Sequence, residues 1–214
     1  MTTSRRYTFD ASLAGLDISK AAYLAANPHV ARLMAAAMVF RQPNSTATST
    51  SASAAQTLLL CRAFGDSYPM KWEISGGSVD AGDSSILDAI ARELWEETGL
   101  VVRHMSSPVL IVPAEGEARY ALSDDMRCGL GIKPDEEDVG INADGLSVTF
   151  LETGEIWAKP TAIVEVDTTD GVVLREDEHV DWAWATEEDV LKGEVVGQDG
   201  CRKRMDFKEK KRGI

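Results

Sequence analysis

Apolar residues recur along the chain in two rhythms, one typical of buried strands and one typical of a helix. Short apolar runs bounded by turn-forming residues predict strands. The segment 83–98 differs, because Leu87, Ile90 and Leu94 recur at helical spacing and form one apolar stripe. Gly99 follows at the position where a glycine commonly ends a helix. The predicted strands are 30–41, 57–62, 101–112, 147–151, 156–166 and 180–185, and a short helix is expected over 186–191.

The chain of 214 residues contains no linker that divides it, and we expect one main domain over residues 30–195. Residues 1–29 are polar with a weak helical pattern, which predicts an N-terminal extension packed on that domain. Within the domain, the Ser/Thr/Ala-rich segment 42–56 and the Gly- and Asp-rich segment 123–145 are expected to be loops, the first a loose tip between two pairing strands. Residues 196–214 are interpreted as a basic C-terminal tail.

Charge narrows the possible partners. The sequence has 22 Lys and Arg against 35 Asp and Glu, which gives a net charge of −13. A protein that holds duplex nucleic acid by matching phosphates with side-chain cations would need the opposite balance, so stable duplex binding is not expected. The negative net charge does not exclude a small phosphate-bearing substrate, because divalent metal ions can supply the positive charge.

Apolar runs and cysteines indicate the compartment. The longest apolar run, 33–40, is too short to span a membrane, so no membrane association is expected. Cys61, Cys128 and Cys201 are odd in number and widely separated, which favours free thiols in a reducing compartment. We therefore expect the cytoplasm, with the nucleus as the alternative.

Three glutamates on the predicted helix are the main candidates for chemistry. Glu93, Glu96 and Glu97 stand at i, i+3 and i+4, so they project from one face, opposite the apolar stripe. Such carboxylates repel one another, and the pattern indicates either a solvated acidic face or a site for a hard divalent cation such as Mg²⁺. The upstream pair Gly76-Gly77 allows a sharp turn that brings a backbone carbonyl close to the same ion.

Together these residues resemble the box of the Nudix hydrolase family, G-x5-E-x7-R-E-U-x-E-E-x-G-U, in which U is aliphatic. The second half of the box matches at every defined position over Arg92-Glu93-Leu94-Trp95-Glu96-Glu97-Thr98-Gly99-Leu100. The first half starts at Gly77 and departs twice. Asp83 stands where the family has glutamate, and eight residues separate it from Arg92 instead of seven.

The resemblance implies an α/β fold, a Nudix-type α/β/α sandwich with a mixed sheet and a loop–helix–loop metal site. It implies Mg²⁺ as the cofactor, with Mn²⁺ as the alternative. Glu178, which precedes a predicted strand, resembles the family's later acidic position, whereas His179 is interpreted as a structural residue hydrogen-bonded near the strand start. The implied metal ligands are Glu93, Glu96, Glu97 and the Gly76 carbonyl; the implied bases are Glu93 and Glu178; the implied supports of the loop are Arg92, Asp83 and Gly77.

The implied function is a metal-dependent hydrolase that cleaves the diphosphate linkage of a nucleoside diphosphate derivative or a similar organic diphosphate. The alternative is a catalytically weak or inactive Nudix-fold module that binds a ligand or regulates. The expected partner is a small organic diphosphate containing a nucleotide. No substrate-binding residue and no oligomeric state follow from the sequence.

Overall fold

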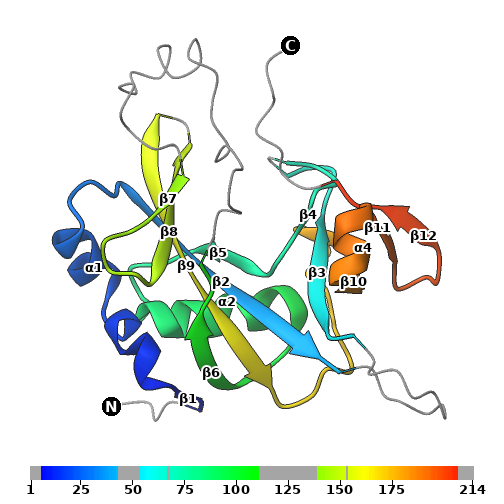
Figure 1. Cartoon of the computed structure of the whole chain (residues 1–214), viewed down its shortest axis with the longest axis horizontal. Helices are drawn as coiled ribbons and strands as arrows, with labels where there is room; N and C mark the ends of the chain where they lie inside the picture. The colour runs from blue at the N-terminus through cyan, green and yellow to red at the C-terminus, as the bar shows by residue number, and fades with distance from the viewer. Residues whose placement is uncertain (1–5, 43–53, 67, 111–138, 153, 207–214) are drawn as a thin grey trace.

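The computed structural model describes residues 6–42, 54–66, 68–110, 139–152 and 154–206 (Figure 1). Its helices are η1 (Ala11–Leu16), α1 (Lys20–Ala26), α2 (Ile86–Thr98) and α4 (Glu187–Lys192). Its strands are β1 (Thr8–Phe9), β2 (Arg32–Arg41), β3 (Gln56–Arg62), β4 (Trp72–Glu73), β5 (Gly76–Ser78), β6 (Val102–Pro108), β7 (Val139–Ile141), β8 (Ser147–Glu152), β9 (Glu155–Val166), β10 (His179–Thr186), β11 (Glu194–Val196) and β12 (Arg202–Arg204).

The sheet is mixed, in the order β1-β6-β9-β2-β3-β10. Strand β2 runs parallel to β9, and β1 runs parallel to β6, whereas β6–β9, β2–β3 and β3–β10 are antiparallel. Strand β2 pairs with β5 at residues 34–36 and with β3 only at residues 40–41. The short strand β5 therefore lies beside the first half of β2.

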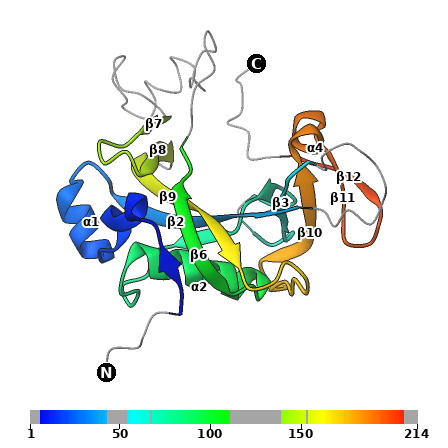
Figure 2. The ribbon, with the colours of Figure 1, turned by 60° about the horizontal axis from the view of Figure 1, so that its bottom comes forward.

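Helices cover both faces of this sheet. The fully buried stripe of Leu87, Ile90 and Leu94 on α2 packs into the main core with residues of β2, β6 and β9. A second core forms around Cys61 and Trp72, on the side covered by α4 and the β11–β12 hairpin. Figure 2 shows α2 beneath β6 and β9, and α4 beside β10. The predicted α/β/α sandwich with a mixed sheet is therefore confirmed.

Each predicted strand overlaps one that the structure contains. The predicted pairing of 30–41 with 57–62 is present, although it is confined to Phe40–Thr57 and Arg41–Gln56. The expected start of the long helix is wrong, because α2 begins at Ile86 and not at residue 83. Residues 83–85 precede the helix: Ser85 is its N-cap, and the carboxylate of Asp83 pairs with Arg92 farther along the chain.

The segments at both ends of the chain share in the fold. Leu13 and Leu16 of η1 have no exposed surface and belong to the main core, and β1 extends the sheet beside β6. Strands β11 and β12 pair antiparallel, so the first residues of the predicted basic tail lie in a hairpin. The other parts of the predicted loops and tail, 43–53, 123–138 and 207–214, lie outside the described residues. No helix in the described part of the chain is long and apolar enough to cross a membrane.

Candidate active site

Helix α2 carries the predicted glutamates, and both of its ends are fixed. The Ser85 hydroxyl accepts the N–H of Asp88 at 3.1 Å and so caps the first turn. Gly99 ends the helix in the left-handed region, at a φ of 70°, which glycine adopts without steric cost. Because the Leu87 and Leu94 side of α2 is buried in the main core, the glutamates on the other side turn toward β5.

Two of the three glutamates are buried. The exposed fraction is 8% for Glu93 and 4% for Glu97, whereas Glu96 is partly exposed. Strand β5 lies against this face of α2, and a Cβ at Gly77 would come within 2.6 Å of Oε2 of Glu93. A side chain at position 77 would therefore displace the Glu93 carboxylate from the place it has here. The spacing of the glutamates predicted that they share one face of the helix. It did not predict that β5 packs over that face, because a three-residue strand of Gly-Gly-Ser has no hydrophobic pattern.

The carboxylate of Glu97 meets the backbone of β5. The N–H of Gly76 donates to Oε2 of Glu97 at 2.9 Å. Burial raises the pKa of Glu97 to about 7, although the Gly76 N–H and the nearby His179 favour the charged form. A carboxylate held out of water at this position gains strongly from a bound cation.

Arg92 links the loop before α2 to the glutamates. Its Nε and Nη2 donate to the two carboxylate oxygens of Asp83, each at 2.9 Å, in a bidentate pair. Its Nη1 donates to Oε1 of Glu93 and to Oε2 of Glu96, again at 2.9 Å, and its Nη2 donates to the Ser78 carbonyl at 3.0 Å. Burial alone would raise the pKa of Asp83, but the hydrogen bonds from Arg92 hold it below its ordinary value. The shorter acid with its extra spacer therefore still reaches the arginine.

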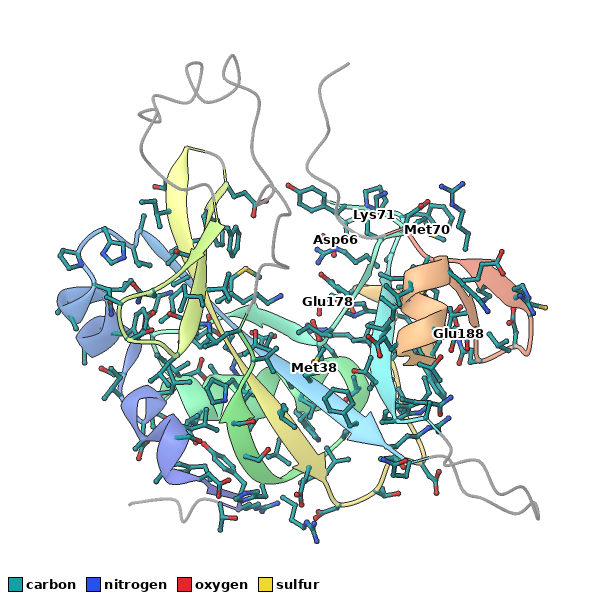
Figure 3. The ribbon with its side chains drawn as sticks, viewed as in Figure 1. Met38, Asp66, Met70, Lys71, Glu178 and Glu188 are labelled. Carbon is teal, nitrogen blue, oxygen red and sulfur yellow. The ribbon has the colours of Figure 1, made fainter. Side chains whose placement is uncertain are left out.

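Glu178 and His179 bring a second part of the chain to the same place. One ligand atom from each of Glu97, Glu178 and His179 lies within 4.8 Å of the others. Burial raises the pKa of Glu93, and the charge of Glu178 contributes in the same direction. Figure 3 shows Glu178 between Met38 of β2 and Asp66, which follows β3, in that view. Glu93 and Glu97 of α2 thus form one carboxylate cluster with the distant Glu178, and Glu96 is attached to it through Arg92.

His179 is buried at the first position of β10, with an exposed fraction of 2%. Its Nε2 lies 3.4 Å from Oε1 of Glu73, and Nη1 of Arg62 donates to that same oxygen at 2.6 Å. A hydrogen bond near the strand start was expected for this histidine, but its place beside the carboxylates was not. In the sequence, only the adjacency of His179 to Glu178 indicated that the histidine could lie at the site. No local pattern indicated Glu73, because its contact with His179 depends on the pairing of β3 with β4.

The donors in this cluster suit a hard divalent cation. Carboxylate oxygens and a backbone carbonyl are the ligands that Mg²⁺ and Mn²⁺ take in proteins. Two of the carboxylates are buried in a medium where an unpaired negative charge is costly, and the pKa of each is raised by that burial. The residues present therefore fit a metal ion.

A family model described as the NUDIX domain matches residues 42–124. Among curated protein sequences, none matches the chain. The similar solved structures include an Ap4A hydrolase binary complex of C. elegans, 20% identical with a TM-score of 0.43, covering 75% of this chain and 84% of that one. The NUDIX domain of Shewanella oneidensis NrtR complexed with ADP ribose is 17% identical with a TM-score of 0.47, and the match covers 82% of this chain and 88% of that one. The MutT protein of Methanosarcina mazei Go1 is 21% identical with a TM-score of 0.44, and the match covers 75% of this chain and 80% of that one.

The box and the matched segment together define the class of protein. The segment 42–124 contains the whole box, from Gly77 to Leu100, and the predicted resemblance to the Nudix family is confirmed over that segment. The predicted kind of enzyme, a Nudix-type pyrophosphohydrolase acting on acid anhydrides in phosphorus-containing substrates, is supported by this match.

Proposed function

We propose that the protein is a Mg²⁺-dependent hydrolase that cleaves the diphosphate linkage of a nucleoside diphosphate derivative or a similar organic diphosphate, in the cytoplasm. The observation that carries the proposal is the burial of Glu93 and Glu97 beside Glu178. Buried carboxylates of one sign are costly without a compensating cation, and their joint presence is explained by a metal that a diphosphate substrate shares.

The proposed ligands come from α2 and from β5. Glu96 and Glu97 are the principal carboxylates, and Glu93 is either a third ligand or the base. Bound Mg²⁺, or Mn²⁺ in its place, would neutralise the diphosphate charge and lower the pKa of a water held on it. Arg92 serves to hold the loop and the helix together, because its guanidinium already contacts Asp83 and two of the glutamates.

The Gly76 carbonyl is the proposed backbone ligand, and strand geometry supports this role. The N–H of Ala37 in β2 donates to the Ser75 carbonyl at 2.9 Å, so Ser75 faces β2 and the next residue faces away. The Gly76 N–H indeed points to Glu97. In an extended strand the N–H and the carbonyl of one residue point to the same edge, so the Gly76 carbonyl lies on the side of the glutamates.

Two carboxylates can take the proton from the attacking water. Glu93 is buried, its pKa is raised by burial, and one of its oxygens accepts Nη1 of Arg92. Glu178 is more exposed, and its carboxylate lies 3.4 Å from Nη1 of Arg175. A raised pKa favours a carboxylate as a general base, which is the argument for Glu93; the easier access of water is the argument for Glu178.

The experiment is a panel of dinucleoside polyphosphates, ADP-ribose, oxidised dNTPs, nucleotide sugars and prenyl diphosphates, assayed with Mg²⁺ and with chelator. We expect Mg²⁺-dependent turnover of at least one member, and ¹⁸O-water identifies which phosphorus is attacked. No turnover on any of them, together with an unchanged metal affinity in Glu97→Gln, would remove the enzyme proposal. The alternative, a Nudix-fold module that binds without turnover, predicts ligand binding to the wild type and no product.

A further inference from the structure

The imidazole of His179 has one nitrogen that the protein leaves without a partner. Its Nε2 faces Oε1 of Glu73, whereas Nδ1 is buried and has no hydrogen-bond partner among the described residues. Buried polar atoms are nearly always paired, and each exception calls for an explanation. Here a ring nitrogen lies within 4.8 Å of the ligand oxygens of both Glu97 and Glu178.

Glu73 determines which nitrogen carries the hydrogen. Its carboxylate is anchored by Arg62, and it can only accept, so the Nε2 that faces it is the donor. That choice leaves a lone pair on Nδ1. A histidine that binds a metal ordinarily donates its other ring N–H to a carboxylate, which fixes the tautomer and makes the free nitrogen more basic. The series Arg62, Glu73, His179 has this arrangement.

We propose that Glu97, Glu178 and His179 form a cation site with an imidazole ligand, so that the protein binds Mn²⁺ or Co²⁺ more tightly than Mg²⁺. Imidazole nitrogen suits transition metals, whereas Mg²⁺ takes oxygen and gains little from it. The proposal rests on the proposed function, since it shares Glu97 and Glu178 with that site. It adds a nitrogen ligand and a metal preference.

A purely structural role for His179 explains less. A buttress for Glu73 would need only Nε2, and it would not require the ring to lie among carboxylates from α2 and from residue 178. A ligand role accounts both for the unpartnered Nδ1 and for the position of the ring among these carboxylates.

The test is pulsed electron paramagnetic resonance of Mn²⁺ bound to the full chain, with metal affinities measured by calorimetry. We expect ¹⁴N modulation from a coordinated imidazole in the wild type and its loss in His179→Gln. Mn²⁺ affinity should fall by about 10- to 100-fold in that variant, with a change in Mg²⁺ affinity below about 3-fold. His104→Gln is the matched control, because His104 contacts Thr8 and Asp10 instead, and it should keep both the nitrogen signal and the affinity.

Glu73→Gln is the second variant, and it keeps the imidazole in place if His179→Gln fails to fold. It should weaken Mn²⁺ binding by about 10-fold while the ¹⁴N signal persists. Bound Mn²⁺ without ¹⁴N modulation in the wild type would overturn the imidazole ligand and leave the proposed hydrolase intact. Nitrogen modulation without turnover on any substrate would support the imidazole ligand and favour the alternative of a Nudix-fold module that binds without turnover.

Discussion

The pair between Asp83 and Arg92 allows a sharp prediction, because Asp83 departs from the family box in both type and spacing. The Asp83 side chain is 7% exposed and accepts two charge-assisted hydrogen bonds at 2.9 Å. Replacement by alanine leaves Arg92 with partners that include Glu93, Glu96 and the Ser78 carbonyl, so the loss is smaller than for a fully isolated buried charge. We expect Asp83→Ala to lower the free energy of unfolding by about 2–3 kcal/mol.

The assay is urea unfolding followed by circular dichroism, with Glu165→Ala as control. Glu165 pairs with Arg103 at the surface, where both side chains are at least half exposed, and its loss should cost below about 1 kcal/mol. A free energy of unfolding for Asp83→Ala equal to that of the control would refute the reasoning that the shorter acid supports the loop.

The pH dependence of the same pair has a defined sign. Because the pKa of Asp83 is lowered in the folded state, its stabilisation is complete above the unfolded value of about 3.9 and is lost as the pH falls through the lower folded value. The difference in free energy of unfolding between the wild type and Asp83→Asn should therefore shrink on acidification. A difference that grows toward low pH would contradict the assignment.

Three further predictions concern the neighbouring groups. Gly77→Ala should lower kcat by about 10²-fold, because its Cβ would press on a buried carboxylate, whereas Gly82→Ala, with no atom within 4 Å of the new Cβ, should keep the rate. The pKa of Glu97 is raised in the folded state, so its stabilising proton is lost as the pH rises through about 7. Between pH 5 and 8 the metal-free wild type should therefore lose about 2 kcal/mol of its free energy of unfolding that Glu97→Gln retains. The same pH dependence of the free energy of unfolding in both proteins would contradict this. Burial raises the pKa of Cys61 to about 11, so iodoacetamide at pH 8 should label the exposed Cys201 at least ~10²-fold faster than Cys61. Peptide mass spectrometry measures both rates, and equal rates would contradict the burial of the Cys61 thiol.

The sequence was informative wherever a residue's role depends on its near neighbours. The helix, its closing Gly99 and the shared face of Glu93, Glu96 and Glu97 all follow from spacings of a few residues. The start of the helix was misplaced, because Ser85 and Asp83 are both good caps and the choice depends on Arg92, nine residues beyond Asp83.

Long-range contacts lay beyond prediction. The burial of Glu97 requires β5, whose glycines carry no periodic signal, to lie across α2. The place of His179 depends on Glu73 and Arg62, which meet through strand pairing that no local pattern encodes. The packing of η1 into the main core likewise arises from a segment whose helical pattern was weak.

The central claim is that the buried carboxylate of Glu97 binds the metal on which hydrolysis depends. The most direct measurement is kcat with Mg²⁺ for Glu97→Gln beside Glu188→Gln, an exposed glutamate of α4 paired with Lys192 and labelled apart from the cluster in Figure 3. The account predicts a fall of at least ~10²-fold in Glu97→Gln with the fold intact, and a wild-type rate in Glu188→Gln. A wild-type rate in Glu97→Gln would contradict it.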